Sequence, residues 1–484
     1  MIFRQIVHDD LGCASYFIGD DKAGVAAVVD PRFEIDEYLE LARYLGVRIE
    51  HIFETHNHAD HVSGHGRLAA ATGATIHVHR LVAPEFEHEP FDHGDEFELG
   101  SLRIKAMHTP GHRPEHTCFL LSDLRRGDEP WAVLTGDSLF VGDVARPDLA
   151  VERTEGARGI YHTLRELLSL PDYIEVWPGH LGGSMCGGPG MDLKVASTIG
   201  FERHHNPMLA IDDEQEFVDA STSKLGAQPP NFRAIVDLNH GPLLTEGVEP
   251  ARLYPVQVTQ RLRAGALVVD VRTDAQFAEG HVPGSISIPL HRGGFGTKLA
   301  WLAAGAEEII FVGRDDADGR RAGSLAAAVG LAEAVRRGGL LAGGWTSWNA
   351  EGQPLAALER MPVDEIGPEL EPGSSGRELE AGSSGPGPAQ VLDVRELAEY
   401  ETGHIPGSIN VPWHDITGIP AGIDPARRVL VMCASGQRAG TAASLLQRFG
   451  AEDVVHVIGG GVPKWGTLGG HLTTESEPQA PALA

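Results

Sequence analysis

The sequence predicts an α/β protein of three domains, and three observations lead to this prediction. The first half alternates apolar, β-rich runs at 25–29 and 47–53 with an amphipathic helical pattern at 34–45. The second half contains an internal repeat, because VVDVRTDAQFAEGHVPGSISIPL at 268–290 aligns without gaps on VLDVRELAEYETGHIPGSINVPW at 391–413. A length of 484 residues suits this number of domains, since one domain takes roughly 100 to 200 residues.

The composition changes along the chain place the domain boundaries. We expect an α/β domain over residues 1–245, two copies of a smaller α/β domain over 251–360 and 389–475, and a flexible linker over 361–388. The linker is expected because GPELEPGSSGRELEAGSSGPGP, which ends at 388, is rich in Gly, Ser, Pro and Glu and lacks apolar periodicity.

Charge and cysteine content restrict the partners and the compartment. A formal net charge of -29 and a pI near 5.2 repel phosphate backbones and anionic lipid, so we expect neither nucleic acid nor a membrane surface as a partner. Four cysteines without CxxC spacing are too sparse for a disulfide framework, and MIFRQIVHDD lacks the apolar core of a signal peptide. We therefore expect a cytoplasmic protein.

Histidines and carboxylates in the first half form a candidate metal site. Of the 24 histidines, 18 precede residue 250. THNHADH, TPGH, TGD and WPGH each follow an apolar run, and they contribute His56, His58, Asp60, His61, His112, Asp137 and His180. Imidazole and carboxylate ligands without cysteine suit zinc, iron or manganese, and a face of two histidines and one carboxylate suits oxygen-activating Fe(II).

These four motifs resemble the metallo-β-lactamase superfamily, whose fold is an αββα sandwich, over roughly residues 1–245. Within this region TGDSLFVGDVARPDL at 135–149 and STIGFERHHNPML at 197–209 look more like persulfide dioxygenases than like thioester hydrolases. The resemblance implies one Fe(II) per chain, and it assigns the iron ligands to His56, His112 and Asp137. Four further residues match the positions that complete a two-metal site, and they either bind a second metal or orient the first by hydrogen bonds: His58, Asp60, His61 and His180.

The repeated phrase, an apolar strand ending in DVR and followed by GHVPGS or GHIPGS, resembles the rhodanese fold. In the second copy VLVMCASGQRAG places Cys433 after an apolar strand and before a helix start. The resemblance implies that Cys433 carries a sulfane sulfur, that Arg438 attracts sulfite or thiosulfate, and that an anion is bound by the loop Ala434, Ser435, Gly436 and Gln437. The first copy reads IIFVGRDDADGRRAGS at this place, and no cysteine occurs between 187 and 432, so we expect that copy to be catalytically silent.

The whole order of domains resembles bacterial persulfide dioxygenase-sulfurtransferase fusions. It implies that dioxygen oxidises a low-molecular-weight thiol persulfide to sulfite, that the last domain interconverts sulfite plus persulfide with thiosulfate, and that the purpose is sulfide detoxification. It also implies a homo-oligomer, either a dimer or a tetramer. The identity of the thiol and the direction of sulfur transfer stay open.

Two alternatives compete with this interpretation. All seven candidate ligands permit a binuclear metal thioester hydrolase of the glyoxalase II kind, fused to a sulfur-carrier module. The second half could also be a persulfide sensor or carrier that delivers sulfur to a partner protein.

Overall fold

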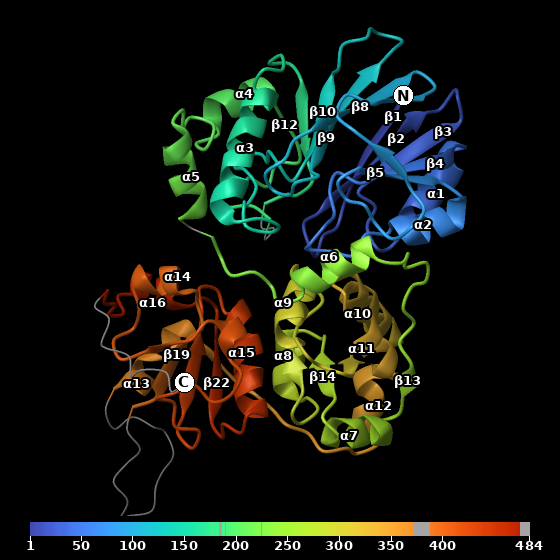
Figure 1. Cartoon of the computed structure of the whole chain (residues 1–484). Coiled ribbons are helices and arrows are strands. Elements are labelled where there is room, and N and C mark those ends of the chain that lie inside the picture. Colours follow the sequence, from blue (N-terminus) through green and yellow to red (C-terminus); the bar gives the residue numbers. More distant parts are fainter. Residues whose placement is uncertain (183–185, 189, 224, 372–387, 475–484) are drawn as a thin grey trace, which may run out of the picture. The chain divides into compact units, whose positions relative to one another are not determined.

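The computed structural model describes residues 1–182, 186–188, 190–223, 225–371 and 388–474, and it divides into two compact units (Figure 1). The first unit comprises Met1–Val248 together with Ser324–Ala332, and the second comprises the remainder from Glu249 onward. Among the described residues, the helices are all too short or too polar to span a lipid bilayer.

The first unit is built on two six-stranded sheets. The first sheet has the order β1-β2-β3-β4-β5-β6, and its strands are β1 (Ile2–Val7), β2 (Ala14–Asp20), β3 (Val25–Val29), β4 (Arg48–Phe53), β5 (Thr75–His79) and β6 (Glu89–Phe91). The second has the order β12-β11-β10-β9-β8-β7, and its strands are β7 (Glu96–Leu99), β8 (Leu102–His108), β9 (Thr117–Asp123), β10 (Ala132–Gly136), β11 (Glu175–Pro178) and β12 (Ser197–Thr198).

Helices cover the outer faces of these sheets. The helices of the unit are α1 (Asp36–Leu45), α2 (His65–Thr72), α3 (Arg153–Leu167), α4 (Ile199–His205), α5 (Glu214–Thr222) and α6 (Phe232–His240). Tyr38 of α1 and Leu68 of α2 pack on the first sheet, whereas Leu164 of α3 and Phe217 of α5 pack on the second. A third apolar cluster, which includes Phe53 and Phe119, fills the space between the sheets. The layers are therefore helix, sheet, sheet, helix, as predicted.

The second unit contains two five-stranded parallel sheets with the same strand order. The first sheet, β13-β17-β16-β14-β15, consists of β13 (Arg252–Leu253), β14 (Leu267–Asp270), β15 (Ile286–Ser287), β16 (Ile309–Val312) and β17 (Gly339–Leu341). The second, β18-β22-β21-β19-β20, consists of β18 (Glu359–Pro362), β19 (Gln390–Asp393), β20 (Ile409–Asn410), β21 (Val429–Met432) and β22 (Val454–Ile458). We call the portion built on the first sheet the cysteine-free module and the portion built on the second the cysteine module.

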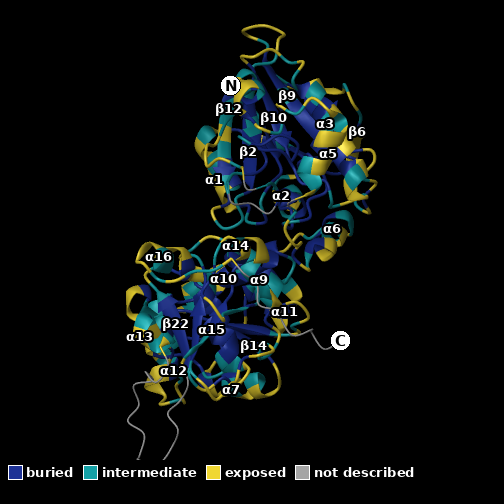
Figure 2. Cartoon of the chain, turned by 90° about the vertical axis from the view of Figure 1, so that its left-hand side faces the viewer, coloured by how far each residue is buried: buried dark blue, intermediate teal, exposed yellow. Residues whose placement is uncertain are grey.

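Helices surround both sheets, and Figure 2 shows buried strands with exposed residues along the outer helices. The cysteine-free module has α7 (Pro255–Arg263), α8 (Asp274–Glu279), α9 (Phe295–Leu302), α10 (Asp316–Ala328), α11 (Ala332–Arg337) and α12 (Gly344–Ala350). The cysteine module has η1 (Val363–Glu365), α13 (Gly367–Leu370), α14 (Leu397–Glu401), η2 (Trp413–Asp415), α15 (Gln437–Arg448) and α16 (Val462–Thr467).

The linker was predicted at 361–388, but its first residues belong to a strand and a helix. Strand β18 pairs in parallel with β22 and adds an edge strand to the second sheet, and α13 follows it. The Ala389 amide also donates to the Glu369 carbonyl over 2.9 Å. Main-chain pairing therefore assigns residues up to 371 to the cysteine module, and the rest of the expected linker, 372–387, lies outside the described residues.

Candidate metal centre and cysteine loop

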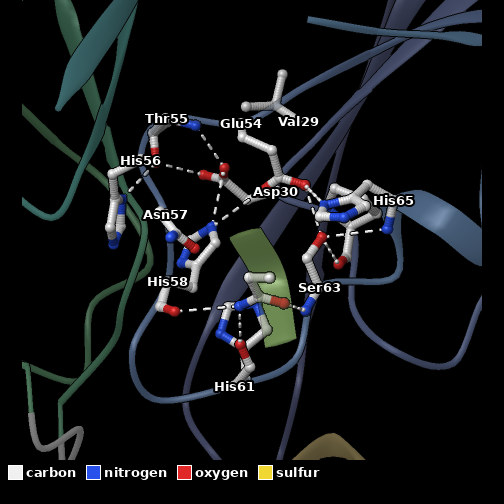
Figure 3. Close-up of polar contacts among 12 residues, drawn as sticks. Val29, Asp30, Glu54, Thr55, His56, Asn57, His58, His61, Ser63 and His65 are labelled. Atoms are coloured by element: carbon white, nitrogen blue, oxygen red, sulfur yellow. Dashed lines mark hydrogen bonds and ion pairs between the residues drawn. The ribbon is translucent and has the colours of Figure 1, made fainter. Parts of the chain in front are cut away.

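The THNHADH motif lies on the loop that leaves β4, and neighbouring elements fix its path. Asp30, at the end of β3, accepts the Thr55 amide over 2.7 Å. Asn239 of α6 donates its side-chain amide to the carbonyls of His58 and His61, over 3.1 and 2.9 Å. Figure 3 shows that His56, His58 and His61 leave this one loop in different directions, with His58 pointing toward Asp30.

His56 presents one free nitrogen. Its Nδ1 lies 2.9 Å from Thr55 Oγ1, and the Thr55 hydroxyl donates to Asp30 Oδ2 over 2.9 Å. Because the Thr55 proton is used on Asp30, His56 Nδ1 carries the proton and Nε2 keeps its lone pair. Burial and the neighbouring His58 hold the pKa of His56 well below its usual value, so the ring is neutral.

His112 and Asp137 complete a group of three around this nitrogen. His112 Nδ1 donates to the Arg146 carbonyl over 3.0 Å, which leaves Nε2 facing Asp137 Oδ2 at 3.5 Å. Burial lowers the pKa of His112. Asp137 Oδ2 also lies 3.9 Å from His56 Nε2, and the ligand atoms of His56, His112 and Asp137 all lie within 4.8 Å of one another.

These three residues fit a metal ion. His56 Nε2 and Asp137 Oδ2 are buried, and neither has a hydrogen-bond partner among the residues that the structure describes. Buried polar atoms are normally paired, since leaving them unpaired costs free energy. Two neutral imidazoles and one carboxylate that converge in a buried place are the ligand set of a divalent transition metal.

His180 is held between two carboxylates. Its Nδ1 lies 2.6 Å from Asp137 Oδ1, and its Nε2 lies 2.8 Å from Asp60 Oδ2. Burial opposes a charge here, but Asp137 and Asp60 raise the pKa of His180 to about 10. Asp60 Oδ1 is in turn 3.1 Å from His61 Nδ1. In this arrangement both nitrogens of His180 act as hydrogen-bond donors and orient Asp137.

The His58 ring lies beside the His56 ring, with the centroids 4.2 Å apart, and its Nε2 faces two buried acids. Its Nε2 lies 3.2 Å from Asp30 Oδ1 and 3.2 Å from Glu54 Oε2. The other Glu54 oxygen accepts from Ser63 and pairs with His65, at 2.6 and 3.0 Å (Figure 3). Although burial opposes it, Asp30 raises the pKa of His58 well above its usual value. Neither acid was predicted from the sequence, although each directly follows an apolar strand, Asp30 after β3 and Glu54 after β4.

His116 is a further buried residue that the sequence analysis missed. Its Nε2 accepts the Asp137 amide over 2.9 Å, and its Nδ1 pairs with Thr109 Oγ1 over 2.9 Å. Burial lowers its pKa to about 3. A neutral His116 thus fixes the backbone that carries Asp137.

Arg146 connects the three-ligand group to a cavity. Its guanidinium forms an ion pair with Asp148 at 2.7 Å, while its carbonyl holds His112. A cavity of about 330 Å³ is lined by Arg146 together with Gly142, Val144, Pro207, Met208 and Leu225. The cavity therefore borders the residue whose carbonyl orients His112.

Cys433 follows β21 and is buried, and the main chain contacts its sulfur. The Gly436 amide donates to Cys433 Sγ over 3.1 Å, and Gly436 adopts φ 91°, a left-handed conformation that favours glycine. Helix α15 begins at the next residue, so the loop 434–437 opens on a helix N-terminus, which attracts anions. The geometry thus places the Cys433 sulfur against a main-chain amide, next to the N-terminus of α15.

Arg438 is paired with an acid that the sequence analysis did not identify. Its two terminal nitrogens lie 2.5 and 2.8 Å from the two oxygens of Glu399, which belongs to α14. A bidentate pair of this kind fixes the plane of the guanidinium. The anion-binding role of Arg438 stays a prediction.

The cysteine-free module has an arginine turn at the corresponding place. Strand β16 ends at Val312, and Arg314 then pairs with Asp318 over 2.8 Å. Both modules share an ion pair at the strand end, Arg272 with Asp270 and Arg395 with Asp393, each at 2.6 Å.

Comparison with protein families divides the chain in the same way. Residues 8–180 match the metallo-beta-lactamase superfamily, and residues 255–351 and 375–468 each match the rhodanese-like domain.

Individual relatives cover from one third to more than two thirds of the chain. The mitochondrial persulfide dioxygenase ETHE1 of Bos taurus is 28% identical over 221 residues, which are 45% of this chain and 79% of that protein. A hydroxyacylglutathione hydrolase of Polaromonas is 31% identical over 170 residues, which are 34% of this chain and 61% of that protein. The crystal structure of a metallo-beta-lactamase from Staphylococcus aureus is 29% identical with a TM-score of 0.62, and the match covers 70% of this chain and 99% of that one.

Proposed function

This chain joins a metallo-β-lactamase domain, with persulfide dioxygenases among its homologues, to two rhodanese-like domains, and we propose that it is an iron-dependent persulfide dioxygenase coupled to a sulfurtransferase. The overall reaction of the first domain is RSSH + O₂ + H₂O giving RSH and H₂SO₃. The cysteine module then combines the sulfite with a second sulfane sulfur.

The observation that carries the first activity is the convergence of His56 Nε2, His112 Nε2 and Asp137 Oδ2. His56, His112 and Asp137 would hold an Fe(II) ion, and the bound metal would supply the activation of dioxygen. The chain's own residues keep the ligands ready: Thr55 and the Arg146 carbonyl fix the imidazole tautomers, and His180 and His116 orient Asp137.

The two acids that face His58 Nε2, Asp30 and Glu54, support a single metal ion per chain. A binuclear centre would need further ligands from His58, Asp60, His61 and His180, and the ligand atoms of His58, Asp60 and His61 do lie within 4.8 Å of one another. Here His58 Nε2 is shared between Asp30 and Glu54, and both nitrogens of His180 face carboxylates. Recruiting His180 for a second metal would break two buried, charge-assisted hydrogen bonds, and recruiting His58 would turn its Nε2 away from Asp30 and Glu54.

Cys433 carries the second activity. Its thiolate attacks the outer sulfur of RSSH, which gives a Cys433 persulfide and releases RSH with the proton. Sulfite then attacks the outer sulfur of this persulfide, the S–S bond breaks toward Cys433, and thiosulfate leaves. The Gly436 amide stabilises the sulfur anion in both steps, and the α15 N-terminus attracts the sulfite.

A product assay with two substrates tests the proposal. Iron-loaded protein receives glutathione persulfide in one sample and a glutathione thioester in the other. We expect sulfite and thiosulfate from the persulfide, formed only with oxygen, and no accelerated thioester hydrolysis. Thioester hydrolysis without any oxygen-dependent sulfite would support the glyoxalase II-like alternative instead.

A further inference from the structure

The helix that follows the Cys433 loop is bound by the cysteine-free module. Thr441 and Ser444 of α15 are fully buried, and both hydroxyls meet the main chain of Ser287. Thr441 Oγ1 donates to the Ser287 carbonyl over 2.8 Å, and the Ser287 amide donates to Ser444 Oγ over 2.9 Å. Buried hydroxyls need such partners, because an unpaired one costs free energy.

Ser287 lies on β15, which is an edge strand of the cysteine-free sheet. An edge strand presents main-chain groups that no neighbouring strand uses. Here α15 uses the amide and the carbonyl of one residue, and Arg448 at its other end donates to the Gly284 carbonyl over 2.6 Å. Figure 1 shows α15 beside the helices of the cysteine-free module.

The cysteine module does not use its own edge strand, β20, in the way the cysteine-free module uses β15. The offset of 123 residues places Asn410 of β20 opposite Ser287 in the alignment. Asn410 instead donates its side-chain amide to the carbonyls of Asp393 and Arg395 within its own module, over 3.0 and 2.9 Å. The edge strand of the cysteine-free copy therefore has a distinct use, although that copy carries no cysteine.

A second contact reaches the Cys433 loop itself. His456 of β22 donates from Nε2 to the Gly436 carbonyl over 2.7 Å, and the amide of the same Gly436 donates to Cys433 Sγ. A methyl group on Gly440 of α15 would lie 2.8 Å from His456 Cε1 and 3.0 Å from Asp274 Oδ1. Asp274 belongs to α8 of the cysteine-free module, so its carboxylate and the His456 ring approach each other across Gly440.

Asp274 is itself held in place. Its Oδ2 pairs with Arg292 of the same module at 2.9 Å, and the carboxylate is 7% exposed. Within the described part of the chain, Asp274 Oδ1 and His456 Nδ1 are both buried without a hydrogen-bond partner. Only a glycine at 440 lets these two groups come so close to the helix.

We propose that the cysteine-free module is a working part of the sulfurtransferase site, in which Asp274 and Ser287 position α15 and His456 so that the Gly436 amide points at Cys433. The module is thus retained for positioning and not as a spacer. Asp274, Thr441 and His456 are positioning residues, since none of them touches the sulfur. The proposal deepens the transferase function proposed above and rests on it for its kinetic test.

The test uses the full-length, iron-loaded chain. Thr441→Val removes the hydroxyl at constant volume, Thr441→Ser restores it, and Asp274→Asn removes the charge at constant shape. Asp318→Asn is the matched control, because Asp318 is an acid of the same module that pairs with Arg314. We measure kcat and KM for thiosulfate formation from glutathione persulfide and sulfite, and hydrogen exchange of the 433–448 segment.

We expect Thr441→Val to lower kcat by about two- to tenfold, the effect of one lost hydrogen bond, with KM for sulfite nearly unchanged. Asp274→Asn should lower kcat in the same direction, because it weakens the buried ion pair with Arg292 that holds Asp274 beside α15. Exchange of the 433–448 segment should be faster in both, and Thr441→Ser and Asp318→Asn should behave like the unmodified chain. Unchanged kcat and exchange in Thr441→Val and Asp274→Asn would overturn the proposal, as would an equal loss in Thr441→Ser.

The two proposals fail in distinguishable ways. If the unmodified chain forms no thiosulfate, the transferase function fails, and hydrogen exchange alone then decides the positioning role. Faster exchange at 433–448 in Asp274→Asn, relative to Asp318→Asn, would keep the positioning role, whereas equal exchange would reject it. Oxygen uptake by the same samples shows that the first domain is folded in each variant.

Discussion

His58 Nε2 lies 3.2 Å from Glu54 Oε2, so the middle histidine of the THNHADH loop faces a buried acid and not the three-ligand group. Removing one partner of a buried ion pair leaves the other charge unpaired. We therefore expect Glu54→Gln to lower the free energy of unfolding by about 3 kcal/mol. Glu50→Gln on the same strand, where Glu50 is exposed and paired with Arg48, should change it by less than about 1 kcal/mol.

The same variant tests the number of metal ions. In Glu54→Gln the His58 Nε2 keeps Asp30 as its one acidic neighbour and becomes easier to recruit, so the zinc content in excess zinc should rise from one toward two per chain. Metal analysis of Glu54→Gln and Glu50→Gln after gel filtration provides the comparison. Two zinc ions in the unmodified chain would contradict the idea that Asp30 and Glu54 restrict the site to one metal.

Cys433→Ser separates the two activities. Because the sulfur acceptor is lost and the metal ligands lie on another domain, we expect oxygen uptake at the normal rate, sulfite as the final product and no enzymatic thiosulfate. Cys118→Ser serves as the control, since Cys118 is buried between Thr109 and Ser138 on β9. Thiosulfate formation at an unchanged rate in Cys433→Ser would remove the transferase from the account.

Arg438→Lys tests the anion-binding role of the paired guanidinium. Lysine keeps the charge but cannot form the planar fork that Glu399 holds, so the cation is no longer fixed beside the loop. We expect KM for sulfite to rise by about tenfold, while oxygen uptake stays the same. Arg427→Lys, at a site where Arg427 binds only a carbonyl in the described structure, should leave KM for sulfite unchanged.

The cysteine-free module should lose stability in mild acid because of His281. Burial lowers the pKa of His281 from 6.5 to about 4, and its Nδ1 donates to the Phe277 carbonyl. Between these two pH values His281 is protonated in the unfolded chain but not in the folded chain. Its full contribution to the free energy of unfolding is therefore present above pH 6.5 and is lost as the pH falls toward 4. Between pH 8 and pH 5 the loss should be about 2 kcal/mol. Urea unfolding of the unmodified chain and of His281→Asn at pH 8 and pH 5 measures this loss of free energy. An equal loss in both proteins would show that His281 is not its cause.

The motif residues could be predicted from sequence because each follows an apolar run that ends a strand. His56 follows a strand of the first sheet, and His112, Asp137 and His180 follow strands of the second, so these side chains meet where the ends of the two sheets face each other. The two-copy organisation could be predicted equally well, because a gapless repeat imposes the same strand order on both sheets.

The supporting residues could not be predicted in this way. Asp30 is far from His58 in sequence and reaches it only because β3 and β4 are neighbours in the sheet. Asp274 approaches His456 through the packing of two modules, which no local pattern encodes. The linker was placed too early because β18 has the polar, exposed composition of an edge strand, which resembles a loop in sequence.

The central claim is that His56, His112 and Asp137 hold one iron that oxidises a persulfide. The most direct test is iron content together with oxygen uptake on adding glutathione persulfide, for the unmodified chain, His112→Ala and the control His108→Ala. The account predicts about one iron per chain, one oxygen consumed per persulfide oxidised, and loss of both only in His112→Ala. Two zinc ions per chain without oxygen uptake, or full iron and activity in His112→Ala, would contradict it.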